Sequence, residues 1–256
     1  MVQQSVSDKP LELKRPEPAK PVGRRAWPGN PAVALWSTAV GKKVVMAVTG
    51  VVLVGFVIAH MVGNLKIFLG KEAIDSYASF LRTMGEPLVP YETLLWTARF
   101  ILLVSVVLHI IAAVQLTLMN WSARPRAYQT KRSIATSIAA LTMRYSGVVL
   151  ALFIVYHLFH LTAGAVGFAP GAFHHLKVYD NIVAGFSVWY VSLFYIVAMA
   201  GLCLHLDHGV WSMFQTLGLN NAGISPALRV VSRVVAAVVF AGFISVPVAV
   251  LAGWLR

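Results

Sequence analysis

Five long apolar stretches restrict what this sequence can fold into more than any other feature. A helix needs about 20 consecutive apolar residues to cross the hydrocarbon core of a bilayer. The stretches of this length are 44–65, 94–118, 145–168, 182–206 and 230–255. Prolines, glycines and charged residues separate them, as is typical of loops between helices. The sequence therefore predicts an all-α membrane protein with five transmembrane helices.

The composition agrees with a bilayer environment. Of the 256 residues, 58% are hydrophobic and 12% are charged, whereas a soluble domain carries about a quarter charged residues. The net charge of +12 would suit nucleic-acid binding, but the Lys and Arg residues lie between the apolar stretches. We expect the lipid bilayer as a partner and no nucleic acid. A single cysteine excludes an internal disulfide framework and a CxxC zinc site.

The distribution of basic residues predicts the orientation. Eight Lys and Arg residues precede the first stretch. Between the second and third stretches, or at the entrance of the third, are Arg124, Arg126, Lys131, Arg132 and Arg144. The alternate segments carry fewer, and Lys and Arg are enriched in cytoplasmic loops. We expect a cell inner or plasma membrane, with the N-terminus cytoplasmic and the C-terminus outside.

Two regions are expected along the chain. Residues 1–40 are basic and rich in proline, and we interpret them as a cytoplasmic tail without a cleavable signal peptide. Residues 41–256 are interpreted as the five-helix membrane domain. No repeat with a solenoid period is visible.

Six histidines lie in or beside the apolar stretches, where ionisable side chains are costly and usually functional. They occupy the first four stretches: His60, then His109, then His157 and His160, then His205 and His208. A lone membrane histidine is equally well explained by a structural hydrogen bond. Histidines on four helices, however, match the way bundles hold cofactors with inward-facing side chains. We therefore expect the first four helices to form a cofactor-binding bundle.

Depth sorts these histidines into two pairs. With a rise of about 1.5 Å per residue, His60 and His157 fall towards the outside, and His109 and His205 towards the cytoplasm. Two imidazoles from facing helices can hold one haem iron axially. The sequence thus predicts two redox centres stacked across the membrane.

Some assignments stay open at this point. His160 is a rival to His157, because Gly164 follows it at i+4. His208 is a rival to His205. Gly201 and Gly209 flank His205 at i−4 and i+4, where small residues suit either a flat macrocycle or close helix packing.

Several segments resemble one membrane-protein family. They are WSTAVGKK from Trp36, MAVTG from Met46, HMVGNLKIFLG from His60, YASFLR from Tyr77, LLWTAR from Leu94, RYSG from Arg144 and VYHL from Val155. The most specific is LHLDHGVWSMFQTLGLN, from Leu204 to Asn220. Over residues 36–256 the chain resembles the single-subunit, five-helix cytochrome b anchor of succinate dehydrogenase (complex II), the b558 type shared with some fumarate reductases.

The resemblance implies a function and a set of iron ligands. Two haem b groups would be held by His60, His109, His157 and His205, one from each of the first four helices. Electrons would pass from an iron–sulfur subunit, which binds a succinate-oxidising flavoprotein subunit, to a quinone such as menaquinone or ubiquinone. The chain itself would carry no succinate-oxidising site and no catalytic residue.

The resemblance also suggests a carboxylate near the start of the second helix. Glu86 and Glu92 are candidate quinone contacts, and Arg99 and Arg144 could bind the quinone head group or a haem propionate. Each of these charges is also explained by topology or by an interface.

Three alternatives remain. The chain could be the anchor of a fumarate reductase, or a transporter that relays protons through its histidines, although inverted repeats typical of transporters are not seen. A His-ligated Rieske-type [2Fe–2S] cluster is the alternative cofactor. Such a cluster needs two cysteines, and Cys203 is alone.

Overall fold

A computed structural model describes residues 29–123, 138–168 and 171–256, and within these ranges the chain is helical without strands. The elements are α1 (Pro31–Ser37), α2 (Ala39–Asn64), η1 (Leu65–Leu69), α3 (Lys71–Thr83), α4 (Thr93–Ser122), α5 (Ile138–His157), η2 (Leu158–Thr162), α6 (Val178–Phe186), α7 (Trp189–Thr216) and α8 (Ser225–Leu251). Five helices are long and apolar enough to cross a membrane. The prediction of an all-α, multi-pass membrane protein is confirmed.

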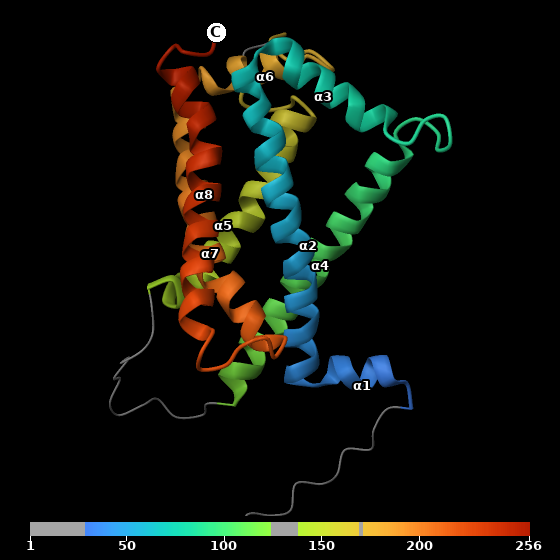
Figure 1. The fold of residues 1–256 in the computed structure, drawn as a ribbon, viewed down its shortest axis with the longest axis vertical. Helices are drawn as coiled ribbons and strands as arrows, with labels where there is room; N and C mark the ends of the chain where they lie inside the picture. Colours follow the sequence, from blue (N-terminus) through green and yellow to red (C-terminus); the bar gives the residue numbers. More distant parts are fainter. Residues whose placement is uncertain (1–28, 124–137, 169–170) are drawn as a thin grey trace, which may run out of the picture.

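Parts of the predicted cytoplasmic regions fall outside this description. They are residues 1–28 of the tail and the basic residues Arg124, Arg126, Lys131 and Arg132. Residues 31–37 of the tail form α1, which lies across the end of α2 (Figure 1). Thr38 separates the two helices with an extended backbone, and its hydroxyl accepts from the Gly41 amide at 2.9 Å as the cap of α2.

The fourth span begins and ends later than the sequence predicted. Residues 178–186 form the separate helix α6, and the membrane helix α7 runs from Trp189 to Thr216. Val188 is extended at the break, and the buried Ser192 hydroxyl donates to the Phe186 carbonyl at 2.6 Å. Hydropathy could not reveal this break, because α6 is apolar as well. It packs against α7 and α8. His205 therefore lies about 16 Å from the end of α7, not at that end.

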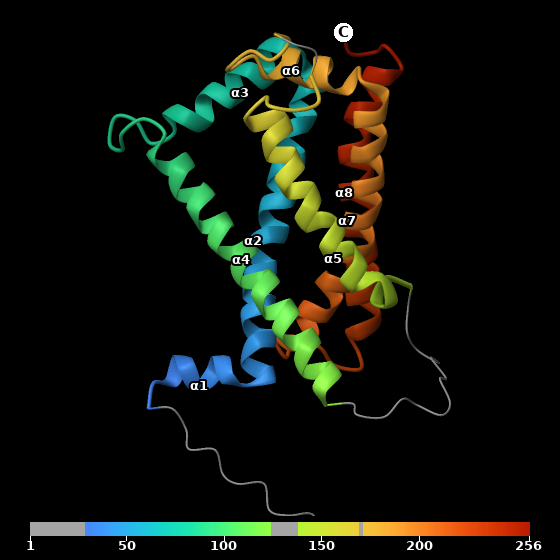
Figure 2. The same cartoon turned by 180° about the vertical axis from the view of Figure 1, so that it is seen from behind.

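The five spans alternate in direction. In Figures 1 and 2, α2, α5 and α8 run from the end that carries α1 towards the end that carries α3, and α4 and α7 run back. We call these the α1 end and the α3 end. The C-terminus lies at the α3 end.

The first four spans are organised as two helix pairs. Close packing joins α2 to α4 and α5 to α7, and α8 packs along α7. Within the described chain, the backbones of α2 and α5 do not pack closely, and neither do those of α4 and α7. Side chains from these opposed helices therefore meet between the two pairs.

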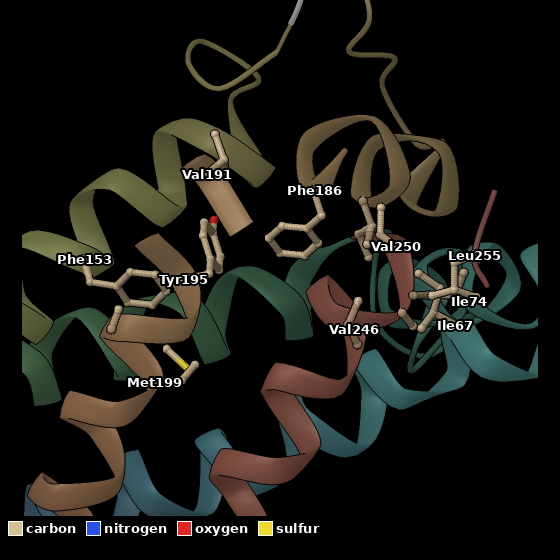
Figure 3. Close-up of a cluster of buried hydrophobic side chains, with 13 residues drawn as sticks. Ile67, Ile74, Phe153, Phe186, Val191, Tyr195, Met199, Val246, Val250 and Leu255 are labelled. Carbon is tan, nitrogen blue, oxygen red and sulfur yellow. The ribbon is translucent and has the colours of Figure 1, made fainter. Parts of the chain in front are cut away.

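Aromatic and aliphatic side chains fill the α3 end of the bundle. Figure 3 shows Tyr195 between Phe153 and Phe186, with ring centroids 5.0 and 4.8 Å away. Val246 and Val250 of α8 belong to the same buried cluster. Since lipid tails are as apolar as these side chains, the cluster stabilises the bundle mainly by close packing.

An ion pair joins α3 to α6 outside the spans. Lys71 Nζ lies 2.6 Å from an Asp180 carboxylate oxygen, and the Asp75 carboxylate accepts from the Tyr179 amide at 3.0 Å. The hydrogen bond with Asp180 is the main reason why the pKa of Lys71 is raised above its ordinary value. These contacts hold the two short helices across the α3 end.

Candidate cofactor site: two histidine pairs

The middle of the bundle holds a histidine pair from α4 and α7. The ring centroids of His109 and His205 are 6.4 Å apart, and the ring planes are inclined by 55°. The opposite helices support both rings. Thr49 Oγ1 of α2 lies 3.1 Å from His109 Nδ1, and Ser146 Oγ of α5 lies 3.3 Å from His205 Nδ1.

The hydrogen bonds of the two hydroxyls indicate which ring nitrogen carries the proton. Thr49 Oγ1 donates to the Val45 carbonyl at 2.8 Å, and Ser146 Oγ donates to the Met143 carbonyl at 3.0 Å. A hydroxyl has a single proton to donate. With the hydroxyl protons on these carbonyls, each histidine donates its Nδ1–H to the hydroxyl oxygen. This tautomer leaves an electron lone pair on each Nε2, as metal ligation requires.

A second pair lies nearer the α3 end, from α2 and α5. The ring centroids of His60 and His157 are 5.9 Å apart, with the planes inclined by 80°. A phenylalanine one turn earlier stacks on each ring: Phe56 on His60 at 5.2 Å, and Phe153 on His157 at 5.7 Å. The sequence prediction paired the same four histidines, and the structure brings each pair together.

The two pairs are stacked along the bundle. Thr49 marks the level of the His109–His205 pair, and His60 follows it by eleven residues on α2. At about 1.5 Å per residue the pairs are about 16 Å apart along the helix axis. The spacing from Ser146 to His157 on α5 is the same.

The hydrogen-bond partners of the second pair are unlike each other. His157 Nδ1 lies 3.2 Å from the Tyr195 hydroxyl. His60 Nε2 instead lies 3.4 Å from the Asn64 amide nitrogen, one turn along the same helix. The ring of His60 is thus supported from its own helix, and the ring of His157 from α7.

The rival histidine His160 faces away from this pair. It is fully buried (0% exposed) on the π-helical turn η2, and its Nδ1 lies 2.8 Å from the Tyr195 hydroxyl. Its ring packs against Phe168 and Phe186. Among the described residues its Nε2 has no hydrogen-bond partner. Tyr195 thus links His160 to His157.

The rival histidine His208 also faces elsewhere. It lies beside Trp211, with ring centroids 6.1 Å apart, and helps to line a small polar pocket between α7 and α8. Arg229 stacks on Trp211 at 3.8 Å. His205, not His208, therefore meets His109.

The candidate quinone or propionate contacts separate into two places. At the α3 end, Glu92 pairs with Arg82 at 3.2 Å and accepts from Trp96 Nε1 at 3.2 Å, and Arg99 stacks on Trp96 at 4.7 Å. Glu86 is exposed in the preceding loop. Arg144 of α5 lies over Trp121, in the last turn of α4, at 5.8 Å. The structure thus gathers Glu92 and Arg99 around one tryptophan, and it does not join them to Arg144.

The small residues beside His205 and the single cysteine face other helices. An added Cβ at Gly201 would meet Val149 at 3.8 Å, and one at Gly209 would meet Met143 at 3.6 Å. Both glycines thus face α5, which favours the close-packing interpretation. Cys203 packs with Met61 in the apolar cluster between α2, α7 and α8, on another face of α7 from His205.

Sequence reasoning missed the three hydroxyls that hold the rings, namely Thr49, Ser146 and Tyr195. A hydroxyl in a membrane helix usually bonds to the backbone of its own helix. Its contact with a histidine on another helix becomes visible only when the arrangement of the helices is known. A sequence signal did exist for two of them. Each stands between a methionine three residues earlier and a glycine, in MAVTG and MRYSG.

The ring separation of each pair matches that of two axial ligands of one metal, although the His60 Nε2 lies beside the Asn64 amide. With about 2 Å from metal to nitrogen and about 1.1 Å from nitrogen to ring centre, two axial imidazoles have centroids about 6.2 Å apart. The observed separations are 6.4 and 5.9 Å. No group of three or more His, Cys, Asp or Glu within the described ranges could hold a metal. Two protein ligands suit a metal whose other ligands come from a macrocycle such as haem.

The fold and the site define a multi-pass helical membrane protein with two stacked pairs of facing imidazoles. Comparisons of the chain with protein-family models, with curated proteins and with solved structures find no match.

Proposed function

We propose that this chain is the membrane-anchor subunit of a succinate dehydrogenase, a succinate:quinone oxidoreductase. It would pass electrons from an iron–sulfur subunit, through two haem b groups within the membrane, to a quinone. The observation that carries this proposal is the pair of stacked imidazole sites on four helices. The resemblance of residues 36–256 to the five-helix cytochrome b anchors supports the same function.

The chain's own residues would hold, orient and insulate the redox groups. When bound, haem b supplies one-electron redox chemistry at each pair. His109 and His205 would hold one group, and His60 and His157 the other. The side chains of Thr49 and Ser146 fix the tautomer of the first pair. The surrounding apolar helices exclude water from both.

Haem is preferred to a Rieske-type cluster because of the ligands near each pair. A Rieske cluster takes two Cys and two His ligands. Cys203 is the single cysteine of the chain and packs with Met61. Two histidines without a thiolate match a bis-imidazole haem.

The partners and orientation follow from the charge distribution. We propose that the α1 end faces the cytoplasm and meets the iron–sulfur subunit, which binds the flavoprotein subunit. Glu92 and Arg99 are proposed as contacts of menaquinone or ubiquinone at the opposite end, because Trp96 holds both side chains in one place. A reporter active only in the cytoplasm, fused after Arg256, should be inactive. Activity of this fusion would contradict the orientation.

Isolation of the native complex tests the function. A tag on this chain should co-purify an iron–sulfur protein and a flavoprotein, and the complex should reduce a quinone with succinate. For substitutions of the paired histidines, His175→Ala is the matched control, because His175 is exposed in a loop between spans. Purification of the chain without these partners, or a complex that oxidises no succinate, would contradict the proposal.

A further inference from the structure

We infer that the four histidine-bearing helices are two copies of one helix pair, and that Thr49 and Ser146 are equivalent positioning residues for His109 and His205. The first copy comprises α2 and α4, and the second comprises α5 and α7. The nature of the group between the two imidazoles rests on the proposed function. The duplication and the hydrogen bonds stand independently of it.

The duplication is visible in the first helix of each copy. Residues 46–60 read MAVTGVVLVGFVIAH, and residues 143–157, which lie 97 positions later, read MRYSGVVLALFIVYH. Seven of the fifteen positions are identical. Matching Val and Leu residues are common between membrane helices, but here Met, Gly, Phe and His also match. Thr49 aligns with Ser146, which conserves a hydroxyl.

The second helices are related more weakly. Leu108-His109 on α4 corresponds to Leu204-His205 on α7, 96 positions later. The two histidines of each copy are therefore almost equally spaced along the chain. A repeat of this kind differs from a solenoid period, because it spans a whole pair of membrane helices.

The side-chain contacts are duplicated as well as the amino-acid sequence. In each copy, the hydroxyl of the first helix meets Nδ1 of the histidine on the second helix, at 3.1 Å for Thr49 and 3.3 Å for Ser146. In each copy a glycine follows the hydroxyl residue and lies close to the histidine. A Cβ added at Gly50 would lie 3.8 Å from His109 Cε1, and one added at Gly147 would lie 3.7 Å from His205 Cε1. Composition alone does not explain such repeated contacts.

The direction of the copies explains which histidines meet. Both α2 and α5 run from the α1 end (Figures 1 and 2), so the copies are parallel and related by an axis along the membrane normal. Residues that lie close to a twofold axis face their own equivalents. His109 therefore meets His205, and His60 meets His157.

Thr49 and Ser146 act through the histidines and not on the bound group. Each hydroxyl accepts a hydrogen bond from Nδ1–H and donates its own hydrogen bond to a backbone carbonyl. Each Nε2 thereby keeps its lone pair. Without the hydroxyl, either nitrogen of the ring could carry the proton, and the ring could rotate.

The test uses the full-length chain in its native complex. Thr49→Val and Ser146→Ala remove the hydroxyls, and Thr49→Ser and Ser146→Thr restore them. Thr117→Val is the matched control, because the Thr117 hydroxyl donates to the Ala113 carbonyl of its own helix at 2.8 Å. The first readout is ¹⁵N NMR of labelled histidine side chains in the haem-depleted chain, because iron on Nε2 would itself hold the proton at Nδ1. The second is the midpoint potential of each haem.

We expect Nδ1–H at His109 and His205 in the wild type and in the conservative variants. In the haem-depleted chain, where no iron occupies Nε2, Thr49→Val should mix the tautomers of His109, and Ser146→Ala those of His205. Both should shift the potential of the same haem in the same direction. Unchanged tautomers, or effects that Thr117→Val reproduces, would overturn the positioning role, and an effect of one hydroxyl alone would overturn the equivalence. Tautomer changes in a chain that contains no haem as isolated and takes up none when it is added would support the positioning role and refute the proposed function.

Discussion

The two histidine pairs use the same helices but are held in different ways. Each ring of the His109–His205 pair is held across the helix pair by a short hydroxyl, and the two arrangements are nearly identical. In the other pair, His157 lies beside Tyr195 and His60 beside Asn64 of its own helix. The first pair keeps the symmetry of a duplicated helix pair, and the second has lost it.

This difference indicates where the two copies have diverged. His160 occupies the position equivalent to Gly63, 97 residues earlier, so the second copy has a buried histidine where the first has a glycine. Tyr195 bridges His160 and His157 through its hydroxyl. The symmetric pair therefore depends on local hydroxyls, whereas the divergent pair depends on a network that can tune one ligand separately.

Removal of a ligand should have the largest effect. His109→Ala or His205→Ala should lower succinate:quinone reductase activity at least tenfold, because one redox centre is lost. Succinate oxidation by a soluble dye should persist, since in the proposed complex the partner subunits would carry out the carbon chemistry. Assays with quinone and with dye on one preparation measure both activities. Retention of full quinone reductase activity and of the spectrum in His205→Ala would refute its role and make His208 the candidate.

The difference between the variants His157→Ala and His160→Ala should be the next largest effect. His157→Ala should abolish the absorbance of one haem, because His157 faces His60. His160→Ala should retain this haem and shift its potential, because His160 faces Phe168 and Phe186. Optical redox titration of the two variants measures both effects. The opposite result would show that His160 is the ligand.

Loss of the Tyr195 hydroxyl should have a moderate effect on one pair only. Tyr195→Phe removes the hydrogen bond to His157. A net hydrogen bond is worth about 1 kcal/mol, which corresponds to about 40 mV for one electron. Redox titration should show a shift near this size for the haem held by His60 and His157. An equal shift of both haems would contradict the separation of the two networks.

The smallest effect is expected at the ion pair of the α3 end. Lys71→Met should leave both pairs unchanged and lower the thermal stability slightly, because Lys71 and Asp180 are partly exposed. Since folding raises the pKa of Lys71, the ion pair stabilises the fold below the ordinary pKa of 10.5 and is lost as the pH rises further. Between pH 8 and pH 11, the unfolding temperature should therefore fall more for the wild type than for Lys71→Met. An equal difference in both proteins would contradict this contribution.

Hydropathy alone predicted the five spans, because each has enough apolar residues to cross a bilayer. It misjudged the fourth, since the break at Val188 depends on the tertiary packing of α6. Depth and resemblance selected the four histidines that the structure pairs. The supporting hydroxyls needed the structure, because Thr49 and Ser146 become informative once α2 faces α4 and α5 faces α7. The Met-x-x-hydroxyl-Gly repeat was readable from the sequence and would have indicated them.

The haem content of this chain, purified free of its partner subunits, tests the central claim most directly. A dithionite-reduced minus oxidised spectrum, with assays of haem, iron and acid-labile sulfide on the isolated chain, counts the redox groups held by the histidine pairs. We predict two haem b groups per wild-type chain, and one in His109→Ala and in His157→Ala. A chain without haem, with acid-labile sulfide in its place or with no visible absorbance at all, would contradict the account.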